Sequence, residues 1–191
     1  SSYRQWTDSL ALYKTEDSES RSQEMDYWNN VLRSVTISND ILSSFCGRDY
    51  HRSSLILDRS YTDKLLTSVH GIYNTQINDL LITALSLTLS ELTGSYEHVI
   101  LMEGHGREDI FPNLDISNTM GWFTTMYPLV VTREEGVCDS IVANKENIRR
   151  IPNNGIGYGS LIGYTDRDLP LVSFNYLGQI SQESTEVEGW Y

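Results

Sequence analysis

A carboxylate directly follows an apolar run in residues 98–110, HVILMEGHGREDI. Residues 99–102 predict a buried strand, and Glu103 stands at its end. A carboxylate beside apolar side chains is partly desolvated, which suits it to proton transfer near neutral pH. A glycine-flanked imidazole, His105, comes two residues later. These residues alone leave two interpretations open: a catalytic acid or base held at a strand terminus, or a strand that runs into a polar surface loop.

Two further patterns in the sequence are similar to known motifs. His105 and Asp109 have the H-x-x-x-D spacing of a catalytic histidine in acyltransferase-like enzymes, but the second histidine and the glycine that flank that motif are missing. The stretch 155–159, GIGYG, follows a basic helix end rather than a strand and lacks the lysine of a phosphate-binding loop. We therefore reject both motifs and expect a sharp turn, or the close approach of a ligand, at these glycines.

The composition of the 191-residue chain fits a globular protein with its own core. The formal net charge of -12 opposes nucleic-acid binding, because such sites are basic. No apolar run approaches the roughly 20 residues of a membrane span, and residues 1–10 lack signal-peptide features. Cys46 and Cys138 lie far apart, and no His/Cys cluster has zinc spacing. We therefore expect a cytoplasmic protein with reduced thiols, no metal, and no membrane or nucleic-acid partner.

Hydrophobic periodicity and turn signals predict helices in alternation with strands. Apolar side chains at helical spacing predict helices over residues 3–13, 24–32, 60–73, 75–94 and 136–150. Runs rich in apolar and β-branched residues predict strands over residues 53–58, 97–103, 120–131 and 171–179. Residues 33–52 have no clear period, and residues 151–164 are predicted to be a glycine-rich loop with a turn at Asn154-Gly155. This order predicts an α/β lobe in which helices pack on a mixed sheet.

The same patterns predict helix ends and faces. Ser60 and Asp63 have capping-box spacing, and Thr75 and Gly94 are expected to cap helix 75–94. The expected apolar face of that helix comprises Ile77, Leu80, Leu81, Ala84, Leu85, Leu89 and Leu92. Helix 136–150 is expected to bury Val137, Ile141 and Ile148.

Several stretches together resemble one family. They are EGHGRE at 103–108, NTMGWFTTMYPL at 118–129, IPNNGIGYG at 151–159 and FNYLGQ at 174–179, preceded by INDLLITAL at 77–85. In order and spacing they are similar to the signature motifs of epimerization domains of nonribosomal peptide synthetases. The stretches SSYRQWTDSL and YWNNVL resemble the linker region of the same domains.

The resemblance implies a chloramphenicol acetyltransferase-like fold, shared with condensation domains, in which two lobes face each other across a tunnel. This chain corresponds mainly to the second lobe. Residues 1–50 would be a helical linker region between the lobes, and residues 51–191 the C-terminal lobe. The first lobe would have to lie elsewhere.

The resemblance also implies a reaction. An aminoacyl or peptidyl residue is carried as a thioester on the 4'-phosphopantetheine arm of a peptidyl carrier protein. It loses its Cα proton and regains it on the other face, so that the L form is converted to the D form. The domain itself binds no cofactor and no metal. The expected partners are the carrier protein and the missing first lobe.

Site residues follow from the motifs they occupy. Glu103 is a candidate acid/base, and the resemblance places the amide of Asn175 near the tunnel, where it could stabilise the enolate oxygen. Five further residues could shape the tunnel: His105, Trp122, Phe123, Tyr127 and Tyr158. Ordinary core packing is an equally good interpretation of the aromatic residues among them.

Two departures from the family pattern leave other functions open. The HHxxxDG motif of the first lobe is absent from this sequence, so the chain holds at most half of an active site. Asn118 also stands where the family usually has an arginine. The alternatives are a condensation domain, which forms peptide bonds, and a non-catalytic lobe that docks a carrier protein.

Overall fold

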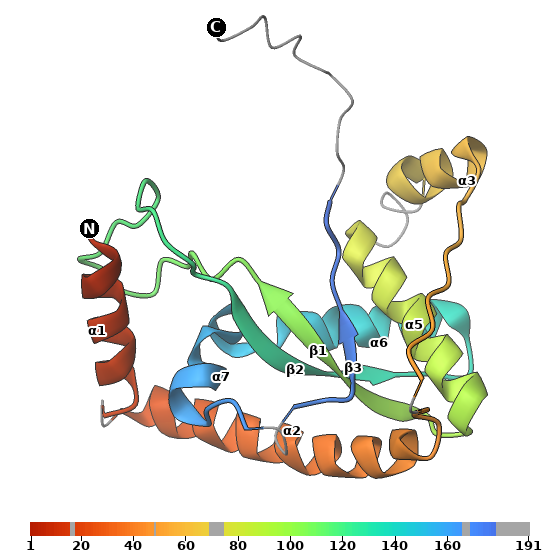
Figure 1. Ribbon diagram of the computed structural model, residues 1–191, viewed down its shortest axis with the longest axis horizontal. Helices are drawn as coiled ribbons and strands as arrows, with labels where there is room; N and C mark the ends of the chain where they lie inside the picture. Colours follow the sequence, from red (N-terminus) through yellow and green to blue (C-terminus); the bar gives the residue numbers. More distant parts are fainter. Residues whose placement is uncertain (16–17, 48, 69–74, 166–168, 179–191) are drawn as a thin grey trace, which may run out of the picture.

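Two helices open the chain in the computed structural model, which describes residues 1–15, 18–47, 49–68, 75–165 and 169–178 (Figure 1). Helix α1 spans Tyr3–Tyr13, as predicted, and starts with a reciprocal cap between Ser2 and Gln5. Helix α2 spans Glu19–Ser43 and therefore extends 11 residues beyond the predicted end at residue 32. Its buried stripe passes through Val35, Ser38 and Leu42. Ser38 is a polar residue on this stripe and therefore interrupts the apolar periodicity of the sequence. Its hydroxyl can be buried because it accepts the backbone N–H of Val99.

The segment after α2 departs from prediction. Residues 53–58 form no strand; they are extended, and Leu55 and Ile56 are 85% and 92% exposed. A short helix α3 (Arg59–Asp63) and a π-helical turn η1 (Lys64–Ser68) follow. The cap of α3 is Asp58, whose carboxylate accepts the N–H of Tyr61, so the expected capping box at Ser60 is wrong. Residues 69–73 of the predicted helix lie outside the described residues.

Helix α5 spans Ile77–Thr93, close to prediction. It starts at Gln76, whose N–H donates to Asp79, rather than at Thr75, and it ends as predicted at Gly94 with a left-handed φ of 77°. The buried face differs from the expected one: Ala84 and Leu92 are exposed, and polar residues are buried in their place. Those polar residues are Asp79, Thr83, Ser86 and Ser90. A hydroxyl can be buried in a helix because it can donate to a carbonyl of its own helix, as Thr83 does to Asp79.

The sheet contains three strands among the described residues: β1 (Glu97–Gly104), β2 (Thr125–Thr132) and β3 (Val172–Phe174). β1 lies in the centre, antiparallel to β2 and parallel to β3, which confirms the predicted mixed sheet. β2 starts five residues later than predicted, and β3 keeps three of the nine predicted residues. Helix α2 packs against β1 and β2, and α5 packs against the same two strands (Figure 1).

Three helical elements lie between β2 and β3. Helix α6 (Val137–Arg149) confirms the predicted helix, but Val137 is exposed, and Asn144 is buried with Ile141 instead. Both polar ends of the Asn144 side chain bond the backbone of Thr132, which makes its burial tolerable. The expected glycine-rich loop is helical: the 3₁₀ turn η2 spans Pro152–Gly155 and helix α7 spans Ile156–Leu161. Glycine is needed inside α7 because a Cβ on Gly157 would lie 2.0 Å from a carboxylate oxygen of Glu24.

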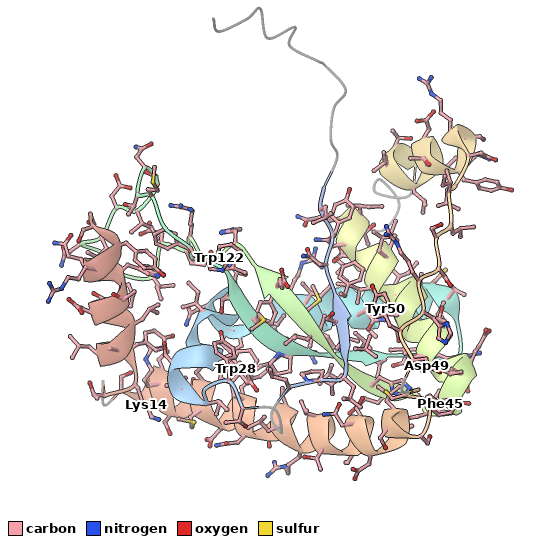
Figure 2. All side chains as sticks on the ribbon, viewed as in Figure 1. Lys14, Trp28, Phe45, Asp49, Tyr50 and Trp122 are labelled. Carbon is pink, nitrogen blue, oxygen red and sulfur yellow. The ribbon has the colours of Figure 1, made fainter. Side chains whose placement is uncertain are left out.

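The main core lies between α2, the sheet and α7. Trp28 of α2 is fully buried and meets the ring of Tyr158 of α7 edge-on, with centroids 5.1 Å apart (Figure 2). Other fully buried side chains include Val35, Ile82, Val99, Ile100, Leu129 and Val131. A smaller cluster of Trp6, Ile116, Phe123 and Ile156 joins α1 to the residues before β2. Trp6 and Trp28 thus anchor the first two helices to these two clusters.

Candidate active site at the end of the central strand

The two residues predicted to act on the substrate lie side by side. β1 and β3 are parallel, and Met102 pairs with Phe174, so the residues that follow these two, Glu103 and Asn175, lie at the same end of the sheet. The Asn175 side-chain amide donates to Glu103 Oε2 at 3.0 Å, although the two residues are 72 positions apart in the sequence. Both are exposed, so the desolvation expected for Glu103 is not present in this chain. The hydrogen bond fixes the direction of the carboxylate.

His105 contacts a different carboxylate. Its Nε2 lies 3.3 Å from Glu108 Oε1, and its Nδ1 accepts the backbone N–H of Arg107 at 3.0 Å. Glu108 in turn accepts the side-chain amide of Asn154 at 2.8 Å. These contacts hold the imidazole against the loop that leaves β1.

Arg107 holds the far end of the same loop. Its guanidinium donates to the carbonyl of Ile116 at 2.7 Å and lies 4.0 Å above the ring centre of Phe123. Gly106, with φ 67°, lies against the backbone of Phe123, where a Cβ would come 1.7 Å from the carbonyl oxygen. The sequence HGR therefore packs the start of the loop against its end, just before β2 begins.

The aromatic tunnel candidates divide into two groups. Phe123, Tyr127 and Tyr158 are buried in the two core clusters, whereas Trp122 is 79% exposed (Figure 2). Burial, together with the nearby charge of Glu108, raises the pKa of Tyr127 above its ordinary value. Their packing is established by this burial, and a role in a tunnel stays a prediction.

Two pockets lie near the site. One, of about 420 Å³, is lined by Arg107, Glu108, Asp109, Pro112, Leu114, Asp115, Ile116 and Ser117. The other, of about 190 Å³, lies between α1, α7 and the residues before β2, and Trp122, Phe123 and Tyr164 contribute to its walls. Glu103 and Asn175 line neither pocket. Their pair lies instead at the exposed carboxyl ends of β1 and β3.

Neither a metal cluster nor a membrane span is found in the described part of the chain. No group of three or more His, Cys, Asp or Glu side chains in that part is arranged to hold a metal ion. No helix in it is long and apolar enough to cross a bilayer.

Comparison with known sequences identifies the family. The family model for the condensation domain matches residues 1–189. The chain belongs to the condensation-domain family. Bacitracin synthase 2 of Bacillus licheniformis is 38% identical over 96% of the chain, and surfactin synthase subunit 2 of Bacillus subtilis (strain 168) is 38% identical over 95%. N-(5-amino-5-carboxypentanoyl)-L-cysteinyl-D-valine synthase of Penicillium chrysogenum is 36% identical over the whole chain. The chain spans 7%, 5% and 5% of these three proteins.

Two solved structures share this fold. The epimerization domain from the third module of tyrocidine synthetase B has a TM-score of 0.65 and 32% identity; the match covers 95% of this chain and 44% of that one. The X-domain from teicoplanin biosynthesis matches with a TM-score of 0.54 and 14% identity, over 87% of this chain and 38% of that one. The second match is evidence for the fold alone. The predicted chloramphenicol acetyltransferase-like α/β fold and the resemblance to the epimerization-domain branch of the family are both supported by these matches.

Two residues of the site escaped the sequence analysis. Glu108 lies in the EGHGRE motif and Asn154 at a predicted turn, and the sequence predicts a site role for neither. Their side chains meet across 46 residues of sequence. A pairing of this kind gives no periodic pattern, so only the fold reveals it.

Proposed function

We propose that this chain is the C-terminal lobe of an epimerization domain in a nonribosomal peptide synthetase. The domain would convert the L-aminoacyl or peptidyl thioester on a carrier protein to the D form. The observation that carries the proposal is the Glu103–Asn175 pair at the ends of two parallel strands. Two similarities support it: the 32% identity to a solved epimerization domain, and the D-valine in the name of a relative that matches the whole chain.

The chemistry requires one group to accept a proton and another to stabilise negative charge. When the Cα–H bond breaks, the proton passes to a base and the electron pair moves into the thioester carbonyl, which becomes an enolate. Return of a proton to the opposite face of Cα restores the thioester, so no other reactant is consumed. We assign the proton-transfer role to the carboxylate of Glu103.

Asn175 would serve the other requirement. A primary amide carries two N–H donors, and the bond to Glu103 uses one of them. The second remains for the enolate oxygen, where a donor aimed at developing charge has its largest effect. A second proton-transfer group has to reach the other face of Cα, and the first lobe, with its HHxxxDG motif, would supply it. That lobe would also cover the end of the sheet at which Glu103 is exposed.

The proposal is tested by Cα exchange in the complete domain, which contains this chain and the first lobe. The carrier protein is loaded with an aminoacyl thioester and incubated in D₂O, and deuterium at Cα and the D/L ratio are read after release. Glu103→Gln is expected to slow exchange by about 10²- to 10⁴-fold. Asn175→Ala is expected to slow it by about 10²-fold, as for loss of one oxyanion donor.

Glu97→Gln is the matched control, because Glu97 lies on the same strand at its other end. It should leave exchange unchanged. Wild-type protein that forms a peptide bond between two loaded carriers without Cα exchange would instead be a condensation domain. Wild-type protein that binds the carrier and does neither would be a docking lobe.

A further inference from the structure

A left-handed turn supports the loop that follows Glu103. Asn153 and Asn154 of η2 have φ values of 45° and 51°, and Gly155 follows with φ 82°. Asparagine is among the few residues other than glycine that tolerate this region. The turn packs closely on the sheet, since the backbone oxygen of Asn154 lies 3.6 Å from where a Cβ on Gly104 would stand. It therefore lies beside the end of β1.

The inner side of the turn is anchored in the core. Glu24 of α2 is 4% exposed, and its Oε2 accepts the hydroxyl of Tyr13 at 2.6 Å and the guanidinium of Arg21 at 2.8 Å. The side-chain amide of Asn153 reaches the same group, at 2.9 Å from the Tyr13 oxygen and 3.3 Å from Glu24 Oε2. The next residue, Asn154, consequently starts from a fixed position.

The outer side of the turn is hydrogen-bonded to the loop that leaves β1. Asn154 donates to Glu108, and the other oxygen of Glu108 faces His105 Nε2. Because His105 Nδ1 accepts the Arg107 N–H, Nε2 is the nitrogen that carries the proton in a neutral ring, and it lies 3.3 Å from Glu108 Oε1. Both ring nitrogens are thus engaged in holding the loop.

We infer that Asn154 is a positioning residue for Glu103. Through Glu108 and His105 it fixes the direction in which the chain leaves β1, two residues after the catalytic carboxylate. The inference rests on the proposed function in so far as Glu103 acts on substrate. A small displacement of a catalytic group lowers its rate without removing it from the site, because reacting atoms have to be aligned closely.

The test uses three variants of the complete domain. Asn154→Gly keeps the left-handed backbone and loses the amide, and Asn154→Asp keeps the shape and places a carboxylate against Glu108. The double variant N154D/E108Q exchanges donor and acceptor, because the new amide at position 108 can donate to the new carboxylate at position 154. Glu146→Gln, on α6, is the matched control, because it also replaces a carboxylate by an amide but lies on another element.

Two measurements are made on each variant: kcat and KM for Cα exchange on a loaded carrier, and hydrogen exchange of the Arg107 amide. We expect both single variants to lower kcat about 10-fold or more with KM unchanged. We also expect faster exchange of the Arg107 amide. The double variant should restore both quantities toward wild type. A retained kcat, a loss confined to KM, or a loss that the double variant does not rescue would overturn the inference.

The amide measurement separates this inference from the proposed function. If the wild-type domain shows no Cα exchange, the proposed function fails. Hydrogen exchange of the Arg107 amide then tests the role of Asn154 by itself. If the Arg107 amide loses its protection from hydrogen exchange in Asn154→Gly and regains it in the double variant, Asn154 holds this loop in place. Protection that is equal in wild type and Asn154→Gly would reject it.

Discussion

A buried carboxylate determines how the first two helices meet. Glu24 accepts hydrogen bonds from Tyr13, Arg21 and Trp28, and all three lose this partner if the carboxylate is removed. We therefore expect Glu24→Ala to lower the free energy of unfolding by about 3 kcal/mol, measured by urea denaturation. Glu19→Ala, at the exposed start of the same helix, is the control. An equal loss in the two variants would contradict a structural role for the buried group.

A buried histidine makes the stability depend on pH. His98 is 1% exposed, its Nε2 lies 2.8 Å from Thr93 Oγ1, and burial lowers its pKa below 6.5. Below pH 6.5 the unfolded chain takes up a proton at this residue that the folded chain resists, so the free energy of unfolding falls as the pH falls. The loss between pH 8 and pH 5 should be smaller in His98→Gln than in wild type. His51→Gln, at an exposed position, should keep the wild-type dependence.

At the scale of elements, substitution of two glycines with left-handed φ separates the cost of backbone strain from the cost of lost packing. A Cβ on Gly94, at the end of α5, would meet nothing within 4 Å, whereas one on Gly155 would lie 1.9 Å from the ring of Tyr127. Gly94→Ala should therefore cost only the conformational penalty, about 1 kcal/mol. Gly155→Ala should cost distinctly more, because the turn has to move away from β2. Similar thermal denaturation midpoints for the two variants would show that the turn is not packed as described.

The site itself is a product of how elements pair. Glu103 and Asn175 meet because β3 lies parallel to β1 and in register with it. Had β3 been antiparallel, Asn175 would stand at the other end of the sheet. The predicted strand boundaries carry no information on this pairing, so the meeting of the two side chains depends on the topology.

At the scale of the whole molecule, the segment between α2 and α3 exposes apolar side chains. Leu55 and Ile56 project from extended backbone, and exposed apolar patches favour association with another surface. We expect the isolated chain to self-associate as its concentration rises, and L55S/I56S to reduce this association in light scattering. The double variant should keep the wild-type Tm, because these side chains contribute little buried area. A fall in Tm would place them in the folded core instead.

The amino-acid sequence by itself determined the local features of this protein. Residue types and spacing predicted most helices, the central strand and the cap at Gly94. These features depend on neighbours within a few positions, where hydrogen bonding and periodicity act. The same reasoning predicted a strand at residues 53–58 that does not form, because an apolar run needs a partner strand as well as the right composition.

Tertiary structure alone decided which distant side chains meet. It made Ser38 and Asn144 buried residues by giving each a backbone partner, and it turned the glycine-rich stretch after Ile151 into a helix packed on Glu24. It also brought Asn175 to Glu103 and Asn154 to Glu108. A hydrogen bond acts over about 3 Å of space, whatever the separation along the chain. Local patterns therefore cannot specify such a contact until the strands and helices have been placed.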